Sequence, residues 1–137
     1  MSEPLLLDTC AILWLINGDP INPEAREAIR SAVDGRVLHL SPISGWEIAT
    51  LVRKRRLALN TNAEDWFENA VRVSAALLDE LTWKILIRSA SLPGDPPSDP
   101  ADRILISTAR QNSLRLVTRD REILKYASAG HVHALKC

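Results

Sequence analysis

Acidic residues stand directly after two short apolar segments of this 137-residue sequence. Asp8 follows the leucine run 5–7, and Asp120 follows the segment 114–118 by one residue. Short apolar runs of this kind predict buried strands of a parallel sheet, and ligands bind beyond the carboxyl ends of such strands. The two carboxylates are therefore expected to lie at one edge of the sheet.

Two further acids lie close to the starts of predicted helices. Glu47 falls near the first full turn of a helix over 43–55, and Asp102 falls in the first turn of a helix over 99–111. Several carboxylates in close proximity repel one another unless a cation joins them, and hard oxygen ligands suit Mg²⁺ or Mn²⁺. Such a cation can lower the pKa of a bound water and neutralise charge on a phosphate. That is the chemistry of phosphodiester hydrolysis.

Each acid also has a purely structural interpretation. Asp8, Asp99 and Asp120 are all suited to cap the start of a helix, and Asp102 stands three residues after Asp99, as in a capping box. Glu47 has apolar neighbours and can equally be a partly exposed helix residue. The local sequence leaves both interpretations open, and the convergence of acids from separate segments favours the metal site.

Hydroxyl and basic side chains near the acids fit the same chemistry. Three hydroxyl residues stand close to the acids in sequence: Thr9, Ser44 and Thr118. They could orient a ligand carboxylate or a water, or they could be structural hydroxyls. The basic segment 53–56 closes the helix that carries Glu47. Through Arg53 and Arg55 it could contact a nucleic-acid backbone, and it equally suits a helix C-terminus, where positive charge is favourable.

The composition limits the expected partners and location. With 17 basic and 17 acidic residues the formal net charge is zero, so a nucleic-acid partner needs a local basic patch. Aromatic residues make up only 4%, which argues against a base-stacking surface. The two cysteines do not suggest a disulfide, and we expect Cys10 to be buried and Cys137 to lie in a tail. With no secretory signal and no apolar stretch near the ~18 residues that span a bilayer, a cytoplasmic protein without membrane contact is expected.

The order of the elements predicts an α/β fold in a single domain over 1–137. Apolar runs predict strands at 5–7, 37–40, 76–78, 114–118 and 131–135. Cap residues, prolines and helical periodicity predict helices that start near 10, 22, 43, 62, 82, 99 and 120. This alternation implies a parallel sheet with helices on both faces. His39 is expected on the second strand, and His131 and His133 on the last, all three without a catalytic role.

Four segments together resemble the PIN domain, and within it the VapC-type toxins of bacterial toxin–antitoxin pairs. In order, they read LLLDTCAILWLI, SPISGWEIATLVRKRRLAL, SDPADRILISTAR and RLVTRDREI. The resemblance covers nearly the whole chain. It implies a three-layer α/β/α sandwich with a central, mostly parallel sheet of four to five strands. It also implies Mg²⁺- or Mn²⁺-dependent endoribonuclease activity, with the catalytic and metal-binding residues Asp8, Glu47, Asp102 and Asp120.

The same resemblance implies an RNA substrate, a homodimer and a small cognate antitoxin. Asp99 matches a recurrent family residue with a structural role. Many relatives have a histidine two residues before the D-P-x-D-R segment, where this chain has Pro97. This departure bears on substrate contacts more than on the metal ligands.

Other interpretations account for fewer residues. A receiver domain needs paired acids at its first strand, and a haloacid-dehalogenase-type phosphatase needs an acid two residues after Asp8, where Cys10 stands. The alternative from another class is a catalytically silent PIN-like module that binds RNA or a protein. The presence of all four acids argues against that alternative, and a metal-binding measurement separates the two.

Overall fold

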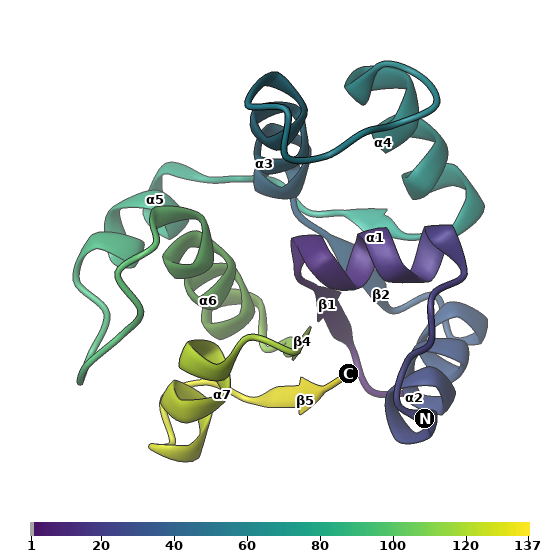
Figure 1. Cartoon of the computed structure of the whole chain (residues 1–137). Coiled ribbons are helices and arrows are strands. Elements are labelled where there is room, and N and C mark those ends of the chain that lie inside the picture. Colours follow the sequence, from purple (N-terminus) through teal and green to yellow (C-terminus); the bar gives the residue numbers. More distant parts are fainter. Residues whose placement is uncertain (1) are drawn as a thin grey trace.

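The computed structural model describes residues 2–137 and has helices on both faces of a five-stranded parallel sheet (Figure 1). The strands are β1 (Leu5–Leu7), β2 (Leu38–Leu40), β3 (Leu77–Leu78), β4 (Arg115–Thr118) and β5 (Ala134–Lys136). The helices are α1 (Thr9–Asn17), α2 (Pro23–Asp34), α3 (Pro42–Arg53), α4 (Ala63–Val73), α5 (Trp83–Ala90), α6 (Pro100–Asn112) and α7 (Arg121–Ser128). This is the predicted α/β sandwich, with all five strands parallel.

The strand order is β3-β2-β1-β4-β5, which makes β1 the central strand. Leu5 pairs with Leu38 of β2 on one side and with Arg115 of β4 on the other. The chain therefore builds one half of the sheet outward from β1 and then returns to build the other half. The reversal creates a crevice at the carboxyl ends of β1 and β4, where ligands bind in folds of this type.

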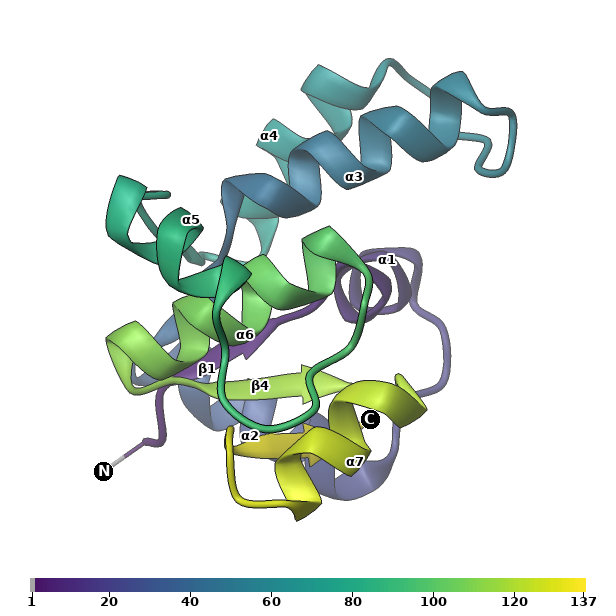
Figure 2. The same cartoon turned by 90° about the vertical axis from the view of Figure 1, so that its left-hand side faces the viewer.

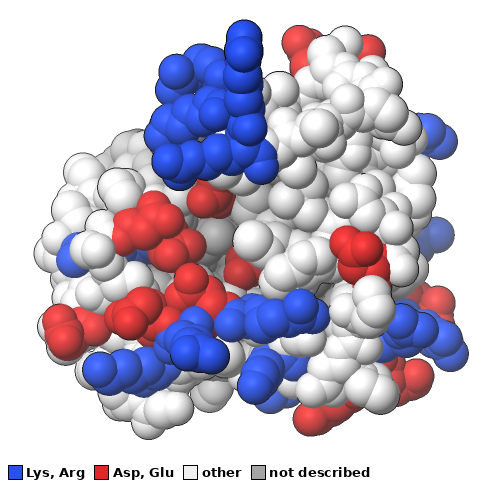
Figure 3. Space-filling model, in the orientation of Figure 1, with Lys and Arg blue, Asp and Glu red and all other residues white. Residues whose placement is uncertain are grey.

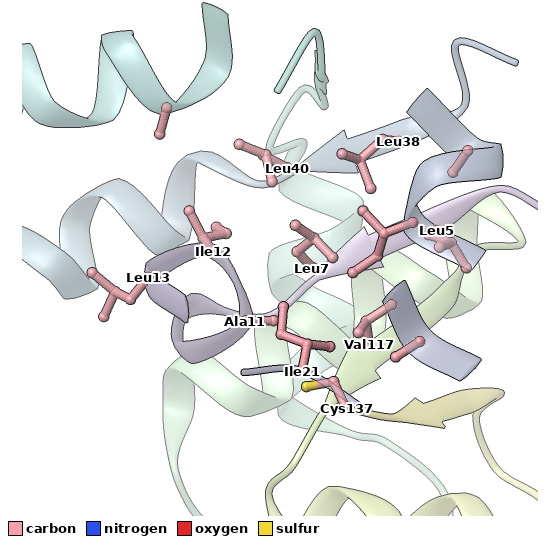
Figure 4. Packing of buried hydrophobic residues seen from close by; sticks show 14 of the residues in the cluster. Leu5, Leu7, Ala11, Ile12, Leu13, Ile21, Leu38, Leu40, Val117 and Cys137 are labelled. Carbon is pink, nitrogen blue, oxygen red and sulfur yellow. The ribbon is translucent and has the colours of Figure 1, made fainter. Parts of the chain in front are cut away.

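Alternating side chains of β1 pack into two apolar clusters, one on each face of the sheet. Leu5 and Leu7 face a cluster built with α1, α2 and α4, as Figure 4 shows for part of it. Leu6 faces a second cluster, formed mainly by α6 and α7. In Figure 2, α6 lies along β1 and β4, while α3 and α4 extend away from the sheet. Burial on both faces explains why β1 is a continuous apolar run.

Most helices begin at a residue whose side chain caps the first turn. Asp8, Ser41, Asp99 and Asp120 each accept a hydrogen bond from a backbone N–H of the helix that follows. These bonds satisfy donors that have no partner within the helix. The end of α1 is set by Gly18, which adopts a left-handed conformation with a φ of 74°. The capping interpretation of the acids is therefore confirmed for Asp8, Asp99 and Asp120.

Two predictions about the end of the chain are wrong. The last strand covers Ala134–Lys136, so His131 and His133 precede it. The His131 ring instead packs against Tyr126, with 4.8 Å between the ring centroids. Cys137 is buried rather than in a tail, because its backbone N–H extends the pairing with β4 by donating to the Thr118 carbonyl at 3.0 Å.

Cys10 is also placed differently from the prediction. It is exposed, because the first turn of α1 lies at the sheet edge and only one side of that turn faces the core. His39 lies on β2 as expected, and its Nδ1 is 2.5 Å from Oδ1 of Asp79. Within 2–137, no helix combines the length and apolar character needed to cross a membrane.

Candidate functional site

A pocket of about 310 Å³ lies at the crevice between β1 and β4. It is lined by Asp8, Thr9, Cys10, Trp14, Glu47, Leu51, Asp99, Asp102, Arg119 and Asp120. All four predicted acids meet here, although they come from segments up to 112 residues apart. On this face acidic side chains gather around a hollow beneath a projecting basic group (Figure 3).

Asp8 is the most deeply placed of the four acids, with an exposed fraction of 6%. Its Oδ1 accepts from the backbone N–H of Ala11 at 2.8 Å, and its Oδ2 accepts from the hydroxyl of Thr118 at 2.6 Å. Both carboxylate oxygens are thus held, one by the start of α1 and the other by the end of β4. A carboxylate that binds a metal needs hydrogen bonds of this kind to fix its orientation.

Glu47 reaches the pocket because it shares one stripe of α3 with Ser44 and Leu51. Residues spaced by three and four positions lie on one side of a helix. The Thr9 hydroxyl donates to Oε1 of Glu47, and the Thr9 oxygen lies 3.0 Å from the Ser44 hydroxyl. Ser44 and Thr9 are both buried. The first turn of α1 therefore positions Glu47, as it does Asp8.

The two acids at the start of α6 differ in role. Asp99 caps the helix, accepting from the backbone N–H of Ala101 at 3.0 Å. Asp102 lies in the first turn and accepts no hydrogen bond from any described residue. Its carboxylate is instead placed by the helix end, where backbone N–H groups favour negative charge. Asp102 therefore remains free to bind a ligand.

Asp120 combines a cap with a place in the pocket. Its Oδ1 accepts from the backbone N–H groups of Glu122 and Ile123 at 2.9 and 3.0 Å. Its own backbone N–H donates to the Thr118 hydroxyl at 3.0 Å, and that hydroxyl donates in turn to Asp8. Thr118 thus links the acids at the ends of β1 and β4.

The acids are costly to keep ionised in this setting. Burial raises the pKa of Asp102 to about 7, with a further contribution from the negative charges of Asp99, Asp120, Glu47 and Asp8. Burial also raises the pKa of Asp8 to about 6, although the hydrogen bonds from Thr118 and Ala11 oppose the shift. The pKa of Glu47 is raised mainly by burial as well. A positive charge in the pocket would favour the ionised forms.

The donor set suits a hard divalent cation. The acids supply only carboxylate oxygens, which Mg²⁺ and Mn²⁺ prefer, and burial with their mutual repulsion raises the pKa of Asp8 and Asp102. Within 2–137, no three His, Cys, Asp or Glu side chains stand close enough to hold an ion in the present rotamers. Mutual repulsion favours this separation of the carboxylates. Side-chain rotation of Glu47 and Asp102 is therefore part of any metal-binding step.

Arg53 and Arg55 are exposed at the end of α3, outside the lining of the pocket. Arg53 ends α3, whereas Arg55 adopts a left-handed conformation with a φ of 57° in the turn that follows. The helix is shorter than the predicted 43–55 at its end. The four basic residues of 53–56 therefore project from a turn, which is the basic group above the hollow in Figure 3.

The loop before α6 is fixed by Arg103. The Nε–H of Arg103 donates to the carbonyl of Pro97 at 2.7 Å, and Pro97 is buried. Arg103 thus holds the loop at Pro97. This is the position where many relatives of the resembled family have a histidine. Pro97 itself does not line the pocket.

Sequence reasoning did not identify four of the residues that line the pocket: Cys10, Trp14, Leu51 and Arg119. Leu51 could have been found, because it follows Glu47 by four positions on the same helix. The only sequence signal for Arg119 was its position next to Asp120. Trp14 carried no local signal, because its partner Arg119 is 105 residues away in sequence.

Comparisons with known proteins agree with this fold. Residues 5–129 match the sequence model of the PIN domain. The chain is 28% identical over 123 residues to "Ribonuclease VapC22" of Mycobacterium tuberculosis, covering 90% of this chain and 91% of that protein.

Two solved structures share the fold. One is VapBC2 from Rickettsia felis bound to a DNA fragment from its promoter, with a TM-score of 0.67, 14% identity, and 97% and 98% of the two chains covered. The other is FitAcB from Neisseria gonorrhoeae, with a TM-score of 0.58, 22% identity, and 96% of each chain covered.

Proposed function

The chain belongs to the PIN domain family, and on that premise we propose that it is a metal-dependent endoribonuclease, the toxin of a toxin–antitoxin pair. The observation that carries the proposal is the meeting of Asp8, Glu47, Asp102 and Asp120 in one pocket at the sheet reversal. The name of the ribonuclease from Mycobacterium tuberculosis supports RNA as the substrate. Acting on cellular RNA, the protein works in the cytoplasm.

Asp8, Glu47, Asp102 and Asp120 would hold Mg²⁺ or Mn²⁺. A cation there supplies charge neutralisation on the phosphate and activation of the attacking water. Thr118 keeps Asp8 oriented, and Thr9 holds Glu47 at the pocket before a cation binds.

Neighbouring groups complete the site. Ser44 supports Thr9, while Asp99 fixes the helix end from which Asp102 projects. The basic turn 53–56 attracts the RNA backbone toward an otherwise acidic pocket, with Arg53 and Arg55 as phosphate contacts.

Protein partners are supported by two apolar surfaces. A groove between α1 and α2 is lined by apolar residues that include Leu15, Ile21, Ile29 and Val33. A narrow groove of this kind fits an amphipathic segment, and we assign it to the antitoxin, in line with solved structures of similar fold that are toxin–antitoxin complexes.

The second apolar surface is the exposed side of α5 and of the edge strand β3. Trp83, Ile87 and Leu78 are 67%, 62% and 51% exposed. Large exposed apolar side chains gathered in one place mark an interaction site. This surface fits a second copy of the chain, and we assign it to the homodimer.

The direct test is cleavage of labelled RNA by the purified protein. We expect cleavage with millimolar Mg²⁺ or Mn²⁺ and none with a chelator. Asp8→Asn and Glu47→Gln should lower the rate at least about a hundredfold, because each removes a charged ligand. Glu68→Gln, an exposed change on α4, is the matched control and should cleave like the unaltered protein.

Full cleavage by Asp8→Asn and Glu47→Gln would refute the assignment of the site. RNA binding without cleavage in any metal, together with a melting temperature unchanged by metal, would instead support the silent binding module.

A further inference from the structure

One cation lines the acidic pocket, and it is not paired with the acids. Arg119 stands between Thr118 and Asp120, and it is the one Lys or Arg among the described residues that line the pocket. No Asp or Glu side chain of the described residues, Asp120 included, lies within ion-pair distance of its guanidinium. A lone cation among carboxylates ordinarily pairs with one of them. Its separation therefore needs a structural cause.

The cause is a set of contacts that hold the guanidinium at the rim of the pocket. Its central carbon lies 3.9 Å from the centre of the Trp14 ring, a stacked arrangement that favours the cation. One nitrogen, Nη2, donates to the carbonyl of Cys137 at 3.0 Å and to that of Pro20 at 3.3 Å. Trp14 is itself packed against the core, so the stack has a fixed base.

These contacts leave part of the guanidinium free. Its Nε and Nη1 donate to no described residue, and Arg119 is exposed. The Pro20 carbonyl and the Trp14 ring are neutral, so these two contacts order the side chain without cancelling its charge. Arg119 thus combines a positive charge, free donors and a fixed position beside the acids.

We propose that Arg119 contacts a phosphate of the RNA next to the one that is cleaved, and that Trp14 is a positioning residue that holds Arg119 for this contact. The inference rests on the proposed nuclease function and deepens it by naming a second point of attachment for the strand. The basic turn 53–56 lies on α3 and Arg119 on the β4–α7 connection, so the two approach the pocket from different elements. A strand held by both crosses the acids, where its backbone can be attacked.

The test measures binding of a short single-stranded RNA in a chelator, across a range of salt concentrations. Arg119→Gln should reduce the slope of log affinity against log salt by about 0.7, the value for one lost phosphate contact on a single strand. Arg119→Lys keeps the charge and should restore most of the slope. Arg72→Gln, the same charge change on α4 away from the pocket, should leave the slope unaltered.

Cleavage kinetics with metal give a second readout. Arg119→Gln should raise KM roughly tenfold and change kcat little, because the lost contact is made equally to the bound substrate and to the transition state. Trp14→Leu should act in the same direction but more weakly. Metal affinity should not fall in either variant. All comparisons are made below the melting temperature of the least stable variant.

The outcomes separate this inference from the nuclease proposal. If the unaltered protein cleaves RNA and Arg119→Gln matches it in salt slope and KM, Arg119 has only a structural role and the inference is wrong. An equal loss of slope in Arg119→Gln and Arg72→Gln would show a general charge effect and would overturn it too. Failure of the unaltered protein to bind or cleave RNA would reject the nuclease proposal itself.

Discussion

The acidic pocket and the α5 surface are opposite in chemistry, yet both are incomplete in the isolated chain. In the pocket, partly buried carboxylates stand together, and burial with their mutual repulsion raises the pKa of Asp8 and Asp102. On α5, apolar side chains such as Trp83 and Ile87 remain in water. Each arrangement costs folding free energy. We infer that each is completed by a ligand: a cation in the pocket and a protein on α5.

The two regions also differ in how firmly they are held. Asp8 is fixed through both carboxylate oxygens, and Asp120 through two backbone N–H groups. Trp83 and Ile87 lie on the outer side of a helix and are largely exposed to solvent. Ordered polar groups suit reaction chemistry, whereas an exposed apolar surface suits association. Each of the following predictions changes one region and expects the other to keep its properties.

The largest effect is expected in the pocket. Asp102→Asn should lower the cleavage rate at least about a hundredfold, because a charged ligand is lost. The same change should raise the melting temperature of the metal-free protein at neutral pH by a few degrees, since it removes a carboxylate that is costly to ionise. Asp95→Asn, in the preceding loop and outside the pocket, is the control. An Asp102→Asn protein that cleaves RNA more slowly but melts at a lower temperature would contradict this account of the pocket.

A smaller effect is expected on α5, and it should leave the pocket intact. Ile87→Asp should weaken the homodimer roughly a hundredfold, because it places a charge in an apolar contact. Size-exclusion chromatography with light scattering should then report a monomer at micromolar concentration. Val73→Asp is the matched control, since Val73 is equally apolar and exposed but lines the α1–α2 groove. If Val73→Asp dissociated the homodimer and Ile87→Asp did not, the assignments would be reversed. The α1–α2 groove would then form the homodimer, and the α5 surface would bind the antitoxin.

The smallest effect concerns the pH dependence of stability. The pKa of Asp8 rises from 3.8 to about 6 on folding, and that of Asp102 from 3.8 to about 7. The folded state therefore binds more protons than the unfolded state across this window, so these groups make stability fall as pH rises from about 4 to 7. In a chelator, the protein should melt a few degrees lower at about pH 8 than at about pH 5.5.

Added metal should reverse this difference in melting temperature between the two pH values. Millimolar Mg²⁺ or Mn²⁺ should stabilise the protein clearly at about pH 8 and little at about pH 5.5, because protons compete with the cation for the same oxygens. The double variant Asp8→Asn, Asp102→Asn should lose both the metal effect and this part of the pH dependence. An equal metal effect at the two pH values would contradict the assignment of the cation to these acids.

The sequence was informative where structure follows from neighbours along the chain. Asp8 and Asp120 could be placed because each follows an apolar run and precedes a helix, and capping is a local interaction. The sheet edge that they share followed from the alternation of elements. Arg119 and Trp14, whose pairing has no local signal, were not found. Arg119 and Trp14 meet only because α1 and the end of β4 lie side by side in the folded protein.

The errors at Cys10, Cys137 and His131 have a similar origin. Burial of Cys137 depends on β5 pairing with β4, a contact that no local pattern specifies. His131 was assigned to a strand by its alternation with His133, whereas its packing on Tyr126 is a tertiary contact. Cys10 lies in an apolar stretch, but its place in the first turn of α1 directs it into the pocket.

The central position of β1 has a consequence for when the protein can act. β1 pairs with Arg115–Val117, so its neighbour on one side is among the last parts of the chain to be synthesised. Until β4 is made and has docked, Asp120 is missing, Asp8 lacks the Thr118 hydroxyl, and Trp14 has no Arg119 to hold. Contacts of such long sequence separation also form late in folding. A growing chain on the ribosome therefore carries no assembled pocket.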